Sequence, residues 1–467
     1  MKNYIKNFVL MFMVALLGIV SVNTTVYGEE LGEVSLLDKI KEIYMVDADA
    51  ESKNVPFVYY INEAGFMIGD FYYNTNLFDN ETKLTSVIMY APGSGMITSF
   101  NDLRDYPLGD KLSLGANLKV IKYNDIKNGA IGNDSSNEEI PAEYIEALHQ
   151  YKNIDNTEVL DPFENTKRNL VFAAATGKLS KQQEAYLRQA YLSDEEEEIL
   201  DVLQNSENRD KLDGYQLYHG WNNSLGLNLT YDINENNAII GEYHYEELTS
   251  QVKDYKSDTI SVAWENKEID NENNPREGHR VISKVKKSLD LLGHDDENNW
   301  DYMKYTLDFR KYFPVFKNST LAVRMRTQST TGEKRIDEER SALRKFETGD
   351  PTAEVYTYAP FFDMSLLGDL DTMKGYNYYR FYDNNSVLYQ TELRVPMDHI
   401  LNGLQGNIYF EAGRVSADFD KDLFTKDMHY SGGLGVRYFF NEHVIIRTDI
   451  GASEEGVQFR MNIGQTF

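Results

Sequence analysis

The side chains of this sequence that could do chemistry are carboxylates, lysines and arginines, because it contains no cysteine and only 8 histidines. The histidines form no HExxH zinc motif, and no GxSxG nucleophile motif occurs. A hydrolase with a site carried on loops is the alternative that leaves no such motif. We therefore expect no catalytic residue, no metal site and no cofactor, and we assign the charged residues to binding or structure.

One acidic run, Glu195–Glu198, has the composition of a cation site. No second set of ligands stands near it at a recognisable spacing. Ser193 precedes the run and Ile199-Leu200 follow it, which is typical of a capped, solvated helix start. The run predicts a helix and not a metal site.

Charged side chains recur in the middle of segments that alternate like β-strands. In 302–315, Tyr305, Leu307 and Phe309 alternate with Thr306, Asp308 and Arg310. Successive side chains of a strand point to opposite faces, so such a strand has one apolar and one charged face. Charges are costly in a dry sandwich core but suit a barrel with a lipid-facing outside and a wet lumen. The predicted lumen-facing charges are Asp308, Arg310, Arg324, Arg326, Glu392, Arg394, Glu411, Arg437, Arg447, Asp449 and Arg460.

The last eleven residues, 457–467, form the clearest amphipathic strand at the end of the chain. The apolar residues of this strand share one face and are Val457, Phe459, Met461, Ile463 and the terminal Phe467. An edge strand of a soluble sandwich alternates in the same way. A strand that stops on an aromatic residue also resembles the C-terminal targeting signal of bacterial outer-membrane barrels, and we adopt that interpretation.

Composition and the N-terminus indicate an exported protein. The net charge of -28 argues against nucleic acid or an anionic membrane surface as the main partner. Lys2 and Lys6 precede an apolar core from Phe8 to Val22, and we interpret residues 1–28 as a signal peptide. A membrane-anchor helix is the alternative, for which this core is short. Residues 29–54 are then a short periplasmic segment.

The rest of the chain, 55–467, predicts an all-β fold: a 16-stranded antiparallel transmembrane β-barrel with a helical insertion in an extracellular loop. An even number of strands with no free edge is what a bilayer requires. Helix signals replace strand signals in 126–211, which we interpret as an acidic helical insertion in loop 3; residues 328–385 form loop 6. The predicted strands are 55–61, 66–78, 83–91, 96–104, 110–124, 214–232, 237–250, 258–269, 279–291, 302–315, one from about 321, 386–397, 404–415, 428–440, 443–452 and 455–467.

Two short motifs resemble one barrel family. Met373, Lys374, Gly375 and Tyr376 in loop 6, followed by Arg380, resemble the loop-6 signature of the Omp85 superfamily. That signature is an aliphatic residue, an arginine, a glycine and an aromatic. The barrel-wall motif of the family is an aromatic, an acid and a glycine at alternate positions, which Tyr409, Glu411 and Gly413 resemble. The superfamily includes the BamA and TamA assembly proteins.

The resemblance implies a latch, in which the loop-6 cation folds into the lumen and pairs with the wall acid. Here Lys374 replaces the arginine and Glu411 stands for the family's aspartate. The two side chains still have opposite charges, but lysine lacks the planar bidentate fork of arginine. The resemblance therefore implies a weaker ion pair than that of the family. The alternative is a surface lysine in a mobile loop and an unrelated lumen acid.

The resemblance also implies a role in outer-membrane biogenesis, by protein assembly or insertion or by translocation of protein or lipid. Outer-membrane lipid is the implied surrounding, and a separate periplasmic subunit or client outer-membrane proteins are the candidate partners; nucleic acid is not. Assembly members carry periplasmic POTRA domains before the barrel, for which segment 29–54 is too short. The alternative function is a diffusion pore, or a surface-exposed antigen or adhesin that presents loop 3.

Overall fold

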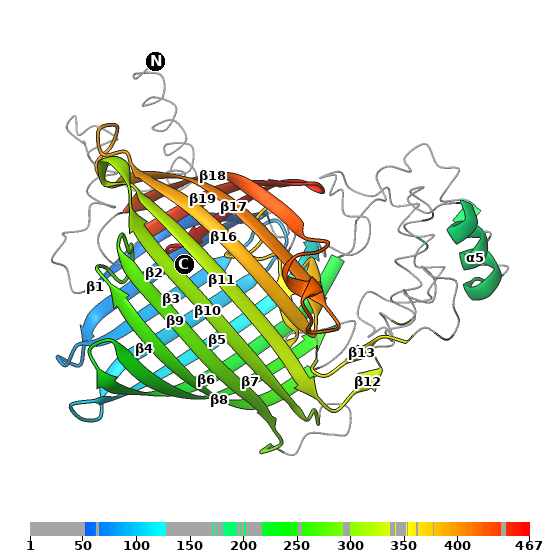
Figure 1. Cartoon of the computed structure of the whole chain (residues 1–467), viewed down its shortest axis with the longest axis horizontal. Coiled ribbons are helices and arrows are strands. Elements are labelled where there is room, and N and C mark those ends of the chain that lie inside the picture. Colours follow the sequence, from blue (N-terminus) through cyan, green and yellow to red (C-terminus); the bar gives the residue numbers. More distant parts are fainter. Residues whose placement is uncertain are drawn as a thin grey trace, which may run out of the picture.

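The computed structural model is built around one large sheet (Figure 1). It describes residues 52–61, 65–127, 181–193, 217–250, 255–292, 299–336, 354–360, 363–376, 378–439 and 445–467, with single residues at 171, 174, 197, 200, 201, 341 and 352. Sixteen of the strands pair antiparallel with their neighbours, which confirms the predicted sheet. They are β1 (Ser52–Ile61), β2 (Gly65–Leu77), β3 (Thr82–Tyr90), β4 (Ile97–Pro107), β5 (Leu112–Lys127), β6 (Leu217–Asn234), β7 (Asn237–Ser250), β8 (Tyr255–Ile269), β9 (Gly278–Leu289), β10 (Tyr302–Pro314), β11 (Thr320–Gly332), β16 (Asn385–Pro396), β17 (Leu404–Ser416), β18 (His429–Phe439), β19 (Ile445–Ser453) and β20 (Gly456–Ile463).

The sheet curls into a barrel in which β20 returns to the side of β1 (Figure 1). Neighbours elsewhere are in register along most of their length, as between β10 and β11 from Tyr302 to Pro314. At the β1–β20 seam, the described residues give one register pair, Ile61 with Arg460. Because ladder hydrogen bonds hold neighbouring strands together, the seam is the weakest lateral contact of the sheet.

Alternation of side chains separates an apolar outside from a charged inside. On β6, Leu225, Leu227 and Leu229 are each at least 40% exposed, and on β10 the predicted outward residues Leu307 and Phe309 are exposed as well. The intervening Asp308 is 5% exposed and lies inside. A continuous apolar exterior of this extent is what lipid contact requires. None of the described helices is long and apolar enough to cross a membrane.

The described residues outside the barrel wall form small elements. Loop 6 contains two short hairpins, β12 (Arg335–Ile336) with β13 (Tyr356–Thr357) and β14 (Ser365–Leu367) with β15 (Phe381–Asp383), which the sequence analysis did not predict. Single-turn 3-10 helices occupy Phe316–Asn318 and Asp422–Phe424.

The helix α5 (Lys181–Tyr191) falls within the predicted insertion, at the same end of the barrel as β12 and β13 (Figure 1). The other described residues of 126–211 are its flanking positions, a few single residues and the end of β5, so the helical insertion as a whole lies outside the described residues. The predicted signal peptide and most of segment 29–54 also lie outside them.

The end of the chain corrects one prediction, because Phe467 does not belong to the lipid-facing row. Strand β20 ends at Ile463, and Gly464 has a φ of 92°, a left-handed conformation that suits glycine and turns the chain inward. Phe467 is 6% exposed and packs against Tyr312 and Ala322 of the inner face. The alternation of a strand cannot be extended beyond the residue at which pairing stops.

Along the same strand, Val457 is exposed, Phe459 is half-buried and Met461 is buried at 3%. The predicted apolar row is therefore exposed at the beginning of β20 and covered toward its end, where Met461 still lies on the outer face opposite Thr448. Ile463 is the last residue of the strand and pairs with Ile446 of β19.

The inward position of Phe467 makes a substitution there a test of packing. We expect Phe467→Leu to destabilise the folded barrel by about 1–1.5 kcal/mol, because leucine fills only part of the space beside Tyr312. The yield of membrane-inserted protein should stay the same. Thermal unfolding on semi-native gels measures the first quantity and membrane fractionation the second. A loss of insertion with unchanged thermal stability would instead support a lipid-facing targeting residue.

Candidate functional site

The loop-6 motif lies inside the barrel. It belongs to the segment 368–380 between β14 and β15, where Met373 and Tyr376 are fully buried and Lys374 is 1% exposed. Met373 and Tyr376 form an apolar cluster with Leu367, Phe381 and Leu388. Leu388 belongs to the wall strand β16, so this cluster fixes the loop to the barrel wall.

The backbone of Lys374 contacts the predicted wall acid. The Lys374 N–H donates to Glu411 Oε2 over 2.6 Å, and Ser431 Oγ donates to the same oxygen over 2.7 Å. Gln390 Nε2 donates to Glu411 Oε1 over 2.6 Å. Glu411 is 1% exposed, and these donors on β16, β18 and loop 6 provide the hydrogen bonds that a buried carboxylate needs.

The side chain of Lys374 has a different partner from the predicted one. Its Nζ lies 3.8 Å from Glu392 Oε2 and 3.6 Å from the centre of the Tyr409 ring. It also lies 3.5 Å from Thr466 Oγ1 in the C-terminal tail. The predicted ion pair with Glu411 is therefore corrected to an ion pair with Glu392. In the sheet Glu392 is directly opposite Tyr409, two residues from Glu411, so an extended lysine side chain reaches past Glu411.

Glycine lets the loop approach the wall closely. A Cβ on Gly375 would lie 2.7 Å from the Ala452 carbonyl oxygen of β19. On the wall, a Cβ on Gly413 would lie 2.9 Å from Met373 Sδ. The contact of Gly375 is with wall backbone, so a side chain there would push the loop away from the wall, whereas a side chain at Gly413 would displace the flexible side chain of Met373.

Polar contacts hold the remaining motif residues near the end of β19 and β20. Tyr376 Oη lies 3.2 Å from the Tyr430 carbonyl oxygen and 3.3 Å from Glu454 Oε1. Burial, together with the charges of Glu454 and Glu455, raises the pKa of Tyr376 to about 12, so the phenol stays protonated and acts as a donor. Arg380 Nη2 forms an ion pair with Glu455 Oε1 at 2.7 Å.

The lysine enters a dense network of buried charges. Glu392 accepts from Arg394 Nε over 3.1 Å and lies 3.6 Å from Arg437 Nη2. Asp449 accepts from Arg437 Nη1 over 3.0 Å. Arg447 continues the network to loop 6, where its Nη2 lies 2.6 Å from Asp371 Oδ1. Strand alternation predicted the inward position of these wall residues but not which of them would pair.

A second set of contacts ties loop 6 to strands β8 to β10. Asp363, 5% exposed, accepts from Tyr302 Oη over 2.5 Å and from Tyr255 Oη over 3.1 Å, and it forms an ion pair with Lys286. Asp363 was not among the predicted site residues, because a loop aspartate has no periodicity that would reveal burial. Strands β8, β9 and β10 supply these partners, whereas Lys374 contacts β16 and β17.

The corrected lysine partner leads to a double-mutant prediction. We expect Lys374→Met and Glu392→Gln to show a coupling of about 1–2 kcal/mol in thermal unfolding, because each removes one charge of a buried pair. Lys374→Met combined with Glu411→Gln should show less than about 0.5 kcal/mol, because methionine keeps the N–H that Glu411 accepts. If Lys374 couples more strongly with Glu411 than with Glu392, the predicted ion pair between Lys374 and Glu411 would be correct after all.

Comparison with known proteins shows which family model and which solved structures this chain is similar to. A model of the Omp85 superfamily domain matches residues 175–467. The fold is similar to the crystal structure of BamA from Haemophilus ducreyi lacking POTRA domains 1–3, with a TM-score of 0.46 and 11% identity over 89% of this chain and 70% of that one. For CdiB from Acinetobacter baumannii the TM-score is 0.44 and the identity 10%, over 89% of this chain and 59% of that one. For CdiB from Escherichia coli the TM-score is 0.48 and the identity 9%, over 89% of this chain and 63% of that one. This chain thus spans less than two thirds of either CdiB chain. Among curated proteins no match was found.

Proposed function

The chain belongs to the Omp85 superfamily, and on this premise we propose that it acts in outer-membrane biogenesis, assembling outer-membrane proteins or moving protein or lipid. As a member of the family it is an outer-membrane β-barrel and not an enzyme. Lipid surrounds its apolar exterior, and a separate periplasmic subunit or client outer-membrane proteins are its proposed partners.

The observation that carries the proposal is the position of loop 6, which contacts the lumen wall from β8 round to β20, about half of the strand order. Asp363 accepts a hydrogen bond from Tyr255 of β8, and the Tyr376 carbonyl oxygen accepts one from Arg460 of β20. Lys374 reaches Glu392 on β16, between these two places. A loop held at these places occupies the lumen and obstructs free passage. In this latched barrel the single register pair between β1 and β20 makes the seam, and not the lumen, the place for a client strand to engage.

The orientation of the barrel belongs to the same proposal. The helix α5 and the hairpin β12–β13 lie at one end (Figure 1), as strand parity requires for loop 3 and loop 6. We assign this end to the cell exterior. The opposite end, with the β8–β9 turn and the C-terminus, then faces the periplasm.

Conductance in planar bilayers separates this function from that of a diffusion pore or surface antigen. The latched barrel should conduct weakly and erratically, and removal of segment 368–380 should convert it to a steady open channel. A wild-type barrel with steady conductance, unchanged by that deletion, would favour the pore.

A role in biogenesis is tested by depletion of the protein in its host, followed by a census of outer-membrane proteins and lipids. Assembly predicts a loss of folded outer-membrane proteins, whereas lipid transport predicts a change in lipid content with proteins retained. An unchanged outer membrane would contradict both forms of the proposal.

A further inference from the structure

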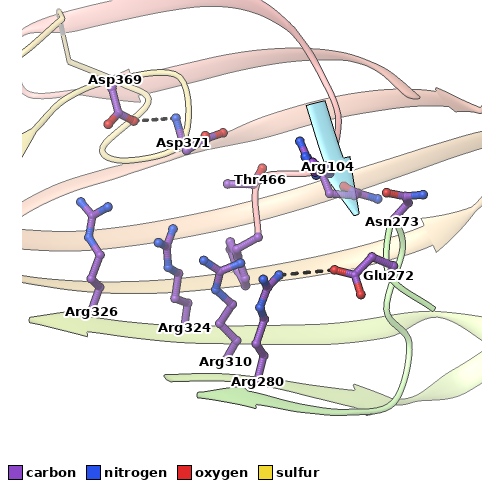
Figure 2. Close-up of a pocket in the computed structure, with 12 residues that line it drawn as sticks. Arg104, Glu272, Asn273, Arg280, Arg310, Arg324, Arg326, Asp369, Asp371 and Thr466 are labelled. Atoms are coloured by element: carbon purple, nitrogen blue, oxygen red, sulfur yellow. Dashed lines mark hydrogen bonds and ion pairs between the residues drawn. The ribbon is translucent and has the colours of Figure 1, made fainter. Parts of the chain in front are cut away.

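A cavity of about 400 Å³ lies in the lumen beside the C-terminal tail. One wall carries Arg280 of β9, Arg310 of β10, and Arg324 and Arg326 of β11. Figure 2 shows these four side chains side by side, extending from the strands into the same space. The residues around the rest of the cavity include Asp369 of loop 6 and Thr466 of the tail.

The arginines face one another because of strand register. Arg280 is paired directly with Arg310, and Arg310 directly with Arg324. Neighbouring strands are about 4.8 Å apart, and like charges in directly opposite positions destabilise a sheet. Such a row therefore needs anions between or above its members.

The described carboxylates only partly neutralise this row. Asp308 is shared by two arginines, at 2.9 Å from Arg310 Nη2 and 2.6 Å from Arg324 Nη2. Glu265 accepts from Arg280 Nε over 2.6 Å. Glu272, which also lines the cavity, lies 3.8 Å from Arg280 Nη1 (Figure 2). Among the described residues, the four guanidinium groups thus have two directly hydrogen-bonded carboxylates and this one more distant partner.

Arg326 is the member of the row without such a partner. Its Nε is buried and makes no hydrogen bond within the described part of the chain. Asp369, also at the cavity, uses its Oδ1 to accept from the backbone N–H groups of Asp371 and Thr372, each over 2.6 Å. An arginine with a buried, unused donor beside three other arginines has the composition of an anion site.

We propose that this cavity binds a phosphate-class anion. The guanidinium fork matches phosphate oxygens in bidentate geometry, and forks from three strands suit an anion with oxygens in several directions better than a planar carboxylate. A volume of about 400 Å³ accommodates a phosphate, a diphosphate or a phosphorylated headgroup. The anion is supplied either free in solution or as the headgroup of a lipid.

Calorimetric titration of the folded, full-length barrel in nonionic detergent with inorganic pyrophosphate at low ionic strength tests the proposal. We expect saturable binding at one site, weakened at least ten-fold by Arg326→Gln and by the independent variant Arg280→Gln. Arg326→Lys should keep part of the affinity, since it retains the charge. Arg414→Gln is the matched control, because Arg414 of β17 donates to the Lys426 carbonyl oxygen and does not line the cavity.

Mixed micelles identify the source of the anion. Competition with pyrophosphate by short-chain phosphatidic acid, but not by phosphatidylcholine, would indicate a lipid headgroup; no competition by either would indicate a soluble phosphate. Folding of each variant is checked by heat-modifiable migration on gels. If wild-type protein shows no saturable binding, or if folded Arg326→Gln and Arg280→Gln bind like wild type, the proposal is wrong. Because conductance is not the readout, this failure would leave the proposed function standing.

Discussion

Replacing Glu392 with glutamine is expected to lower the free energy of unfolding of the barrel by about 3–5 kcal/mol. Glu392 is fully buried beside Arg394, Arg437 and Lys374, with the closest of these contacts, Arg394 Nε, at 3.1 Å. Removing one member of a buried ionic network leaves its partners as uncompensated charges. The resulting loss of stability is larger than the net stabilisation that the intact network provides. Glutamine keeps the shape of the side chain, so the effect reports charge.

Thermal unfolding and the heat-modifiable fraction on semi-native gels measure this loss. Glu392→Asp should retain most of the stability, because it keeps the charge. Glu268→Gln is the matched control at a glutamate whose side chain is 69% exposed. We expect the control to change stability by less than about 0.5 kcal/mol. Equal effects of Glu392→Gln and Glu268→Gln would mean that Glu392 does not stabilise the contact between loop 6 and the wall.

The barrel wall could be predicted from sequence because its information is local. Alternation in segments such as 302–315 determines which side chains point inward, and the structure has Asp308 inside and Leu307 outside as predicted. The number of strands follows from the turns between such segments. No long-range information is needed for either, and the sixteen strands were found within a few residues of their observed ends.

The pairing of loop 6 residues with wall residues could not be predicted in this way. The family resemblance indicated that Lys374 would meet Glu411, and the backbone of Lys374 does so, but the ammonium group extends to Glu392. Both acids face inward on neighbouring strands, so side-chain length and register decide between them. Phe467 illustrates the same limit, because the inward turn at Gly464 ends the alternation on which its prediction depended.

The two sets of contacts between loop 6 and the barrel wall differ in chemistry. At β16 to β18 the loop is held by a motif with glycines, an aromatic ring and a shared carboxylate. At β8 to β10 it is held by one aspartate, Asp363, with tyrosines and lysines around it. A loop fixed at two places loses conformational freedom at both, so releasing either one should increase motion of the whole segment between them.

Replacing Asp363 with asparagine is therefore expected to release this end of loop 6. The substitution leaves Lys286 without its buried counter-ion and weakens the hydrogen bonds from Tyr302 and Tyr255. Because the Lys286 side chain is still 20% exposed, we expect a cost of about 2–4 kcal/mol, at the lower side of that for a fully buried pair. The released loop should raise conductance in planar bilayers and speed proteolysis between residues 354 and 376.

The pH dependence of the Asp363 contact in the wild-type protein is the control for the Asp363→Asn experiment. Burial alone would raise the pKa of Asp363, but the adjacent Lys286 and Lys304 outweigh burial and hold that pKa well below its usual range. A carboxyl whose pKa is lowered by folding stabilises the folded form above its unfolded pKa of about 3.9, and loses this contribution only as the pH falls further toward the folded pKa. The wild-type loop should thus remain closed from pH 7 to about pH 5, whereas Asp363→Asn should be open over that whole range. Opening of the wild-type loop near pH 5, or equal proteolysis of the two proteins at pH 7, would show that the Asp363 carboxylate does not hold loop 6 against β8 to β10.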